Sequence, residues 1–331
     1  MPAVQKFSGD DLIIVTGGAG FIGSNIVLDL ATAGLRVVVC DLFRSGEKWR
    51  NIAAAWLYDI VHPDDLFEWL ARHGDKVAAI VHMGAISSTL EKDVDKFVGA
   101  NIRLTLDLWN WCAANAIRLI YASSAATYGD GSAGFSDEQS PAALAALRPL
   151  NSYGWSKHVV DRRVVDDVTR GRAAPRQWVG LKFFNVYGPN ETHKGFMQSL
   201  VSKISPAVKA GETVTLFKSH DPNYPDGGQQ RDFIYVKDCV AIVSWLLERP
   251  ETSGLFNVGT GVPRSFLDLV RAVCAAVGSA PNVRYIDTPH ELRAQYQYFT
   301  RADMKKLRCA GYEASFYSLE DGVRDYLGKL S

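Results

Sequence analysis

Several features that would assign a protein to a specialised class are missing from this sequence of 331 residues. It has 36 basic and 36 acidic residues, so no net positive charge would attract nucleic acid or an anionic membrane. It contains no apolar run of about 18 residues, which a membrane-spanning helix needs, and no low-complexity or repeated segment. With 47% hydrophobic residues, the composition instead predicts one large domain or two closely joined ones.

Cysteine is scarce, and its spacing predicts neither disulfides nor a metal site. The five cysteines form no CxxC pair and no metal-like spacing with histidine, so we expect buried thiols in a reducing compartment. They are Cys40, Cys112, Cys239, Cys274 and Cys309. Residues 1–11, MPAVQKFSGDD, contain acids and lead directly into an apolar run, unlike a signal peptide. We therefore expect a cytoplasmic protein.

Residues 11–41, DLIIVTGGAGFIGSNIVLDLATAGLRVVVCD, have the pattern of a strand, a glycine turn, a helix and a second strand. A β-branched run without polar alternation at 13–15 indicates a strand buried on both faces of a parallel sheet. A helical period runs from Phe21 to Ala33, and Gly34 stands where a helix would end. The second strand, RVVVC, ends before Asp41.

The turn between these elements predicts a dinucleotide site. Gly17, Gly20 and Gly23 are spaced GxxGxxG, which differs from the familiar GxGxxG. The physical demand is the same, because a tight turn lets the backbone and a helix N-terminus approach a pyrophosphate. The strand before the glycines and the helix after them supply the structural context that a glycine triplet alone lacks.

The end of the second strand bears on the choice between NAD and NADP. Asp41 is positioned to bind an adenosine ribose, which favours NAD. Arg44 and Lys48 follow closely, and they would either neutralise a 2′-phosphate or remain solvated loop charges. The pattern alone leaves the choice open.

Further strand–helix units predict an α/β protein with a doubly wound parallel sheet. Residues 77–85 form a strand that runs into a small-residue loop, and Asn101 opens a helical segment through Asn115. The next strand, within 117–130, ends in hydroxyl-bearing residues. Because parallel strands present their carboxyl ends at one sheet edge, we expect these loops to gather there.

Tyr153 and Lys157, in NSYGWSK, are four residues apart and would share one face of a helix. A lysine ammonium beside a phenol lowers the phenol pKa, so the tyrosine would exchange a proton with an alcohol during hydride transfer. Ser124, at the end of the preceding strand, would hydrogen-bond the same oxygen, with Ser123 as its competitor. Together with the glycines, this set predicts an enzyme rather than a non-catalytic nucleotide-binding module.

These residues, in this order, resemble the extended short-chain dehydrogenase/reductases, and RDFIYVKD (231–238) and FNVGTG (256–261) are typical of the nucleotide-sugar members. The resemblance implies a Rossmann domain at 1–180 and mainly a smaller α/β substrate-binding lobe at 181–331. Segments near 234–260 would return to the first domain. It also implies a retained nicotinamide cofactor and a homo-oligomer.

The motifs favour epimerisation over dehydration. Dehydratases resemble one another in an Asp-Glu pair after the strand-end hydroxyl, whereas Ala125 and Ala126 stand here. The segments 121–129, 149–157 and FFNVYGPNETHKG (183–195) resemble the ADP-heptose 6-epimerases. That family inverts C6 of ADP-D-glycero-D-manno-heptose through a C6 carbonyl with bound NADP, for the lipopolysaccharide inner core. Its two acid/base groups correspond to Tyr153 and Lys194, although Lys194 would otherwise be a solvated loop lysine.

The resemblance implies further contacts, carried over position by position. Contacts to the cofactor would come from Phe21, Ile22, Leu42, Lys48, Asp59, Met83, Gly84, Ala85, Ser87, Asn101, Lys157 and Val186. Contacts to the substrate would come from Ser124, Asn185, Phe196, Lys203, Phe217, His220, Arg231 and Tyr296.

Some positions allow another interpretation or depart from the pattern of the ADP-heptose 6-epimerases. Arg231 suits a diphosphate bidentately, but it would equally form an ion pair with Asp232 or Asp238. Met83 stands where an acid is common, and the loop at 220–230 is longer than usual. The nearest alternative is a UDP-hexose 4-epimerase that uses NAD, which would share the serine, the tyrosine and Lys157.

Overall fold

The computed structural model describes residues 7–89, 91–293 and 296–328, and its centre is a sheet of seven parallel strands. The strand order is β10-β6-β5-β4-β1-β2-β3, which confirms the predicted doubly wound α/β fold. The strands are β1 (Leu12–Thr16), β2 (Arg36–Cys40), β3 (Asp59–Val61), β4 (Val77–His82), β5 (Arg118–Ser124), β6 (Gln177–Phe183) and β10 (Gly254–Val258).

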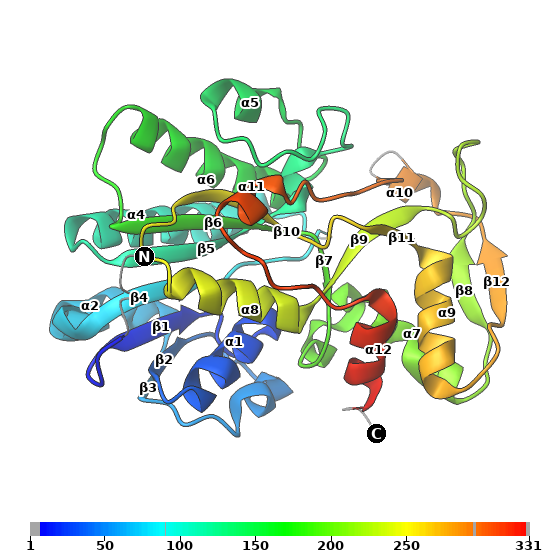
Figure 1. Ribbon diagram of the computed structural model, residues 1–331, viewed down its shortest axis with the longest axis horizontal. Helices are drawn as coiled ribbons and strands as arrows, with labels where there is room; N and C mark the ends of the chain where they lie inside the picture. Colours follow the sequence, from blue (N-terminus) through cyan, green and yellow to red (C-terminus); the bar gives the residue numbers. More distant parts are fainter. Residues whose placement is uncertain (1–6, 90, 294–295, 329–331) are drawn as a thin grey trace.

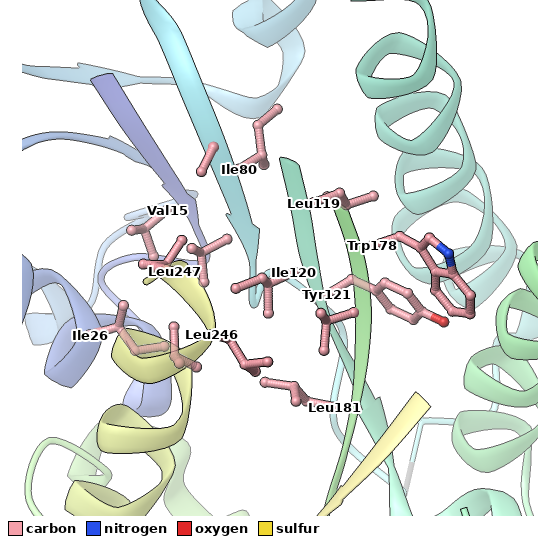
Figure 2. Close-up of a cluster of buried hydrophobic side chains, with 14 of the residues drawn as sticks. Val15, Ile26, Ile80, Leu119, Ile120, Tyr121, Trp178, Leu181, Leu246 and Leu247 are labelled. Carbon is pink, nitrogen blue, oxygen red and sulfur yellow. The ribbon is translucent and has the colours of Figure 1, made fainter. Parts of the chain in front are cut away.

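Helices cover both faces of this sheet (Figure 1). One face carries α1 (Phe21–Thr32) and α8 (Val236–Leu247), and the other carries α4 (Leu104–Ala114) and α6 (Ser152–Thr169). Figure 2 shows the apolar packing, in which Ile26 of α1 and Leu246 of α8 lie beside the strands. The side chains at 13–15 of β1 are buried, as their unalternating apolar run predicted, because a parallel sheet covered on both faces has no solvated side.

The second lobe contains two small sheets and three longer helices, to the right in Figure 1. The sheets are β11-β9-β7 and β12-β8, from β7 (Asn185–Tyr187), β8 (Val214–Phe217), β9 (Gln230–Tyr235), β11 (Pro263–Ser265) and β12 (Val283–Ile286). The helices are α7 (Leu200–Lys209), α9 (Phe266–Val277) and α12 (Leu319–Gly328). They enclose a separate apolar core that includes Val201, Val270 and Tyr326. The boundary at residue 180 stays a prediction.

Five shorter α-helices, besides several 3₁₀ turns, lie in the described ranges. They are α2 (Leu66–His73), α3 (Val94–Phe97), α5 (Pro141–Ala146), α10 (His290–Arg293) and α11 (Lys305–Cys309). None of the helices in the described ranges is long and apolar enough to cross a membrane. Those ranges also contain no cluster of histidine, cysteine and acidic side chains that would hold a metal ion.

The helix predicted to open at Asn101 begins earlier, so that boundary was wrong. Asp93 caps α3 by accepting the N–H of Asp95, and a π-helical turn at Val98–Arg103 joins α3 to α4. A π-helical turn holds one more residue than an α-helical turn, so it shifts the apolar period and hides the continuity of the helix. Asn101 lies inside this turn.

The prediction of buried thiols was wrong for one cysteine. Four of the five are buried and free, while Cys309 is exposed because it ends the short surface helix α11. Burial raises the pKa of Cys40 to about 12, with the adjacent Asp41 adding to the effect. Thiolate chemistry is therefore disfavoured at Cys40.

One buried carboxyl makes the stability of the protein pH-dependent. Asp238, in the first turn of α8, accepts the N–H of Tyr317 at 3.1 Å, and burial raises its pKa to about 6. Between pH about 4 and about 6 the native state therefore binds more protons than the unfolded state, so stability falls as pH rises. The full penalty, on the order of 2 kcal/mol, applies above pH 6.

We predict that Asp238→Asn raises the thermal midpoint by several degrees at pH 7.5, because the neutral amide removes the penalty and keeps an acceptor for Tyr317. Differential scanning calorimetry at pH 7.5 and pH 4 measures this effect. The gap between variant and wild type closes at pH 4, and an equal gap at both values would refute the assignment.

Candidate active site

A cleft of about 1500 Å³ lies where the carboxyl ends of the central strands meet the second lobe, and residues of both lobes line it. The predicted site residues that the structure brings together there are Gly17, Gly20, Phe21, Ile22, Gly23, Asp41, Leu42, Lys48, Met83, Gly84, Ala85, Ser87, Ser124, Tyr153, Lys157, Asn185, Val186, Lys194, Lys203, Phe217 and Tyr296. Sequence positions nearly 300 residues apart thus share one cavity.

The glycine turn has the space that a dinucleotide pyrophosphate needs. Gly17 has a φ of 63°, and a Cβ there would lie 2.6 Å from the backbone nitrogen of Gly84. A Cβ on Gly23 would collide with the carbonyl oxygen of Gly17. No side chain caps the first turn of α1, so its N–H groups are available to an anion. The turn therefore fits the predicted cofactor.

Asp41 lines the end of the cleft where the sequence predicts the adenosine ribose, and its carboxylate already has three partners. Its carboxylate accepts the N–H groups of Ala19 and Leu42 at 2.8 and 2.7 Å and the ammonium of Lys48 at 2.5 Å. Arg44 follows with a φ of 51° and also lines the cleft. Lys48 thus neutralises Asp41, while Arg44 and Asp64 add one charge of each sign to this end of the cleft.

The strand-end serine and the helix tyrosine both face the cleft. Ser124 ends β5, Tyr153 lies in the first turn of α6, and both line the same cavity. The turn that follows Ser124 approaches α6 closely, since a Cβ on Gly154 would lie 2.6 Å from the carbonyl oxygen of Ala126. Ser123 instead donates to Asp161 at 2.7 Å, which leaves Ser124 as the serine that faces Tyr153.

The expected lowering of the tyrosine pKa is not found, so that expectation was wrong. Burial raises the pKa of Tyr153 above its ordinary value, and the nearby Ser124 hydroxyl opposes the shift. Burial also lowers the pKa of Lys157 to about 8, against the attraction of Asp161. The desolvation of both groups outweighs their neighbours.

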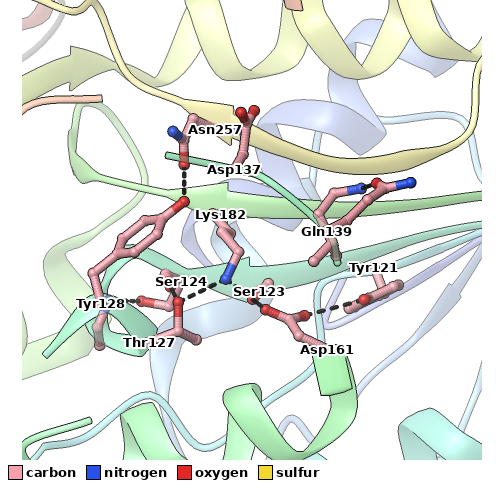
Figure 3. Close-up of polar contacts among 12 residues, drawn as sticks. Tyr121, Ser123, Ser124, Thr127, Tyr128, Asp137, Gln139, Asp161, Lys182 and Asn257 are labelled. Carbon is pink, nitrogen blue, oxygen red and sulfur yellow. Dashed lines mark hydrogen bonds and ion pairs between the residues drawn. The ribbon is translucent and has the colours of Figure 1, made fainter. Parts of the chain in front are cut away.

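A buried ion pair lies beside Ser123 at the end of β5, as Figure 3 shows. Lys182 of β6 and Asp161 of α6 are fully buried, with nitrogen and oxygen 2.8 Å apart. The carboxylate also accepts the hydroxyls of Ser123 and Tyr121, at 2.7 and 3.1 Å. Lys182 also donates to Thr127 in the turn after β5, at 2.8 Å. The pair thus joins β5, β6 and α6 at the point where the serine and tyrosine meet.

Lys194 reaches the cleft from a different part of the chain. It lies in the 3₁₀ turn Thr192–Met197, half-buried, with its ammonium 5.2 Å from the centre of the Phe21 ring. Burial lowers its pKa, Lys203 adds to this effect and Glu191 opposes it. Lys194 is therefore poised to be neutral more readily than a solvated lysine.

Five of the predicted contact residues do not line the cleft. Phe196 is 89% exposed, and His220 lies at the exposed start of the long loop. Asp59 accepts the indole N–H of Trp69 at 2.7 Å, away from the cavity. Asn101 lies behind the cleft wall, where its amide bonds the backbone of Ile86 in both directions. The fifth is Arg231.

Arg231 is buried beside the cleft, and the alternative of an ion pair with Asp232 or Asp238 is not observed. Its guanidinium bonds the carbonyl oxygens of Gln230 and Gln297 and lies 5.5 Å from the ring centres of Phe266 and Tyr296. Burial lowers its pKa to about 10. Both rings line the cleft, so the charge lies one side-chain layer away from it.

The sequence interpretation missed some residues that line the cleft. His193 and Gln297 do so, next to the predicted Lys194 and Tyr296, and Phe266 does so from the start of α9. Proximity in sequence to a predicted contact was the signal available for the first two. Phe266 had no such signal, because an aromatic residue at a helix start is ordinarily part of a core.

Residues 13–259 match the model of the NAD dependent epimerase/dehydratase family, so the chain belongs to that family. This confirms the predicted epimerase class and, at the level of the family, the nicotinamide cofactor. Similar proteins include two ADP-L-glycero-D-manno-heptose-6-epimerases. The one from Fusobacterium nucleatum is 45% identical, over 96% of this chain and 97% of its own. The one from Nitratidesulfovibrio vulgaris strain DP4 is 47% identical, over the same shares.

Two solved structures are similar over almost the whole chain. A Helicobacter pylori ADP-L-glycero-D-manno-heptose-6-epimerase has a TM-score of 0.79 and 27% identity, covering 100% of this chain and 99% of its own. A Thermus thermophilus UDP-glucose 4-epimerase in complex with NAD has a TM-score of 0.74 and 26% identity, covering 96% and 98%. The shared fold spans both lobes.

We predict that Lys182→Met lowers the free energy of unfolding by about 3–5 kcal/mol, because it leaves the Asp161 carboxylate buried without its cation. Chemical denaturation followed by circular dichroism measures the loss. Adding Asp161→Asn recovers part of it, since the amide oxygen still accepts from Ser123. Lys209→Met, at an exposed position, is the matched control, and an equally small loss in both single variants would contradict the prediction.

Proposed function

We propose that this protein inverts C6 of ADP-D-glycero-D-manno-heptose to give the L-glycero epimer, a precursor of the lipopolysaccharide inner core. The observation that carries the proposal is the cleft itself, where Tyr153 and Lys194 from separate segments line the cavity that contains the glycine turn. The names of the relatives at 45% and 47% identity supply the substrate. The absence of a carboxyl pair after Ser124 argues against elimination.

Tyr153 and Ser124 act at the C6 oxygen in the step that oxidises C6 to a carbonyl. The tyrosine takes the hydroxyl proton as C6 becomes a carbonyl, and Ser124, which lines the same cleft, donates a hydrogen bond to that oxygen. Lys157, one helical turn along and buried, stabilises the phenolate as long as it carries its charge. A nicotinamide cofactor, when bound in this cleft, supplies the hydride chemistry at carbon.

A second proton-transfer group is required by the stereochemistry. Because C6 lies outside the sugar ring, rotation about C5–C6 turns the opposite face of the carbonyl toward the reductant. Its oxygen then points to another wall of the pocket, and Lys194 gives the proton there. Its lowered pKa allows the proton to be returned when the reaction runs in the other direction.

We infer that the cofactor is NADP. Asp41, which would exclude a 2′-phosphate by repulsion, is neutralised by Lys48 at 2.5 Å. Arg44 lines the same end of the cleft and is the cation that an added phosphate would meet. The residues present therefore suit a phosphorylated ribose better than Asp41 alone suggests.

Proton NMR of the purified protein with ADP-D-glycero-D-manno-heptose, without added cofactor, tests the reaction. The L-glycero epimer should accumulate to equilibrium, and the cofactor released on denaturation should have the mass of NADP or NADPH. A folded, cofactor-loaded protein that leaves the heptose unchanged and converts UDP-glucose would overturn the proposal.

We predict that Lys194→Ala lowers kcat for epimerisation by at least about 100-fold, the usual contribution of a general acid or base. Lys194→Arg should be similarly slow, because a guanidinium keeps its proton at working pH. Cofactor content should stay at the wild-type level in both. Lys209→Ala, an exposed lysine outside the cleft, is the control. A rate within twofold of wild type in Lys194→Ala would remove the lysine from the mechanism.

A further inference from the structure

We propose that Asn51 is a positioning residue that ties the segment carrying Lys194 to the glycine turn, so that the second acid/base group is fixed by the cofactor site. This inference rests on the proposed function. It concerns a residue outside the cleft lining, which acts through the backbone of a neighbouring segment.

One amide connects the two segments. Asn51 lies at the end of the 3₁₀ helix Glu47–Ile52, and its Nδ2 donates to the carbonyl oxygen of Ala19 at 2.9 Å. The same Nδ2 donates to the carbonyl oxygen of Asn190 at 3.3 Å and lies 3.2 Å from Nδ1 of His193. Ala19 is in the glycine turn, whereas Asn190 lies four residues before Lys194 and His193 directly precedes it. Burial lowers the pKa of His193, followed by Lys48 and Lys194, so a neutral ring is available to accept this contact.

Two further asparagines support the same junction. Asn25 of α1 donates from Nδ2 to the carbonyl oxygen of Pro189 at 3.1 Å, and Asn190 donates to Ser24 Oγ at 3.1 Å. Both contacts reach the first turns of α1, the helix that the glycine turn opens. The outer side of the Lys194 segment is therefore bonded to the dinucleotide-binding element at several points.

The inner side of the segment is fixed by a buried carboxylate. Glu191 accepts the N–H and the hydroxyl of Ser199 at 2.5 and 2.7 Å and the N–H of Gly188 at 3.3 Å. The N–H of Lys194 donates to the carbonyl oxygen of Glu191 at 3.0 Å. With the inner side held, the place of the lysine ammonium depends on the outer contacts, of which Asn51 is the one that reaches the glycine turn directly.

Asn51→Asp tests the proposal, because it keeps the shape of the side chain but places an acceptor against two carbonyl oxygens. With cofactor saturating, we expect kcat to fall about 10-fold and KM to stay within twofold. In a Lys194→Ala background, Asn51→Asp should lower kcat no further. A residue that acts through Lys194 has no effect on the rate once that lysine has been removed. Asn115→Ala, an exposed asparagine bonded within its own helix end, is the control.

A second readout does not depend on the substrate. In the cofactor-bound protein, the rate of amine-reactive labelling at Lys194, followed by mass spectrometry, should rise at least threefold in Asn51→Asp and in Asn51→Ser. Labelling of Lys209 should not change. Unchanged labelling at Lys194, or a kcat loss that adds fully to that of Lys194→Ala, would overturn the inference. If the wild type converts no ADP-heptose, the proposed function fails while the labelling result still decides the role of Asn51.

Discussion

The buried ion pair of Asp161 and Lys182 is the constraint on which the candidate site depends. Two charges removed from water are costly unless each finds further partners, and here the carboxylate also accepts two hydroxyls while the ammonium donates to Thr127. These bonds fix β5 and β6 relative to α6. Because Ser123 is used in this network, Ser124 is left for the cleft, and Lys157, one turn before Asp161, is held on the same helix.

The cleft is lined by more basic than acidic side chains, although the whole sequence has equal numbers of both. Lys48, Lys157, Lys194, Lys203 and Arg44 line it, whereas Asp41, one of the two acids there, is bonded to Lys48. Burial lowers the pKa of Lys157 to about 8 and that of Lys194 to below its ordinary value. The cleft therefore combines attraction for phosphate groups with lysines that release a proton at moderate pH.

The fold and the first half of the site could be predicted because each depends on local sequence. Buried parallel strands have continuous apolar runs, and the glycine turn and the Tyr153–Lys157 spacing lie within single elements. The place of Arg231 and the pKa of Tyr153 could not be predicted, because both depend on burial created by segments far apart in the chain. The long helix around Asn101 was misjudged for another reason, since the π-helical turn breaks the period from which helices are recognised.

The π-helical turn also fixes the number of residues that the segment Val98–Arg103 must contain. Removing one residue from Val98–Arg103 would restore a regular hydrogen-bond ladder, but it would rotate the preceding turn by about 100° relative to α4. Phe97, now fully buried, would leave the core, and Asn101 would lose the backbone of Ile86, which it holds beside the cleft. A single-residue deletion in this segment would therefore disturb both the apolar core and the loop around Ile86 that lines the cleft.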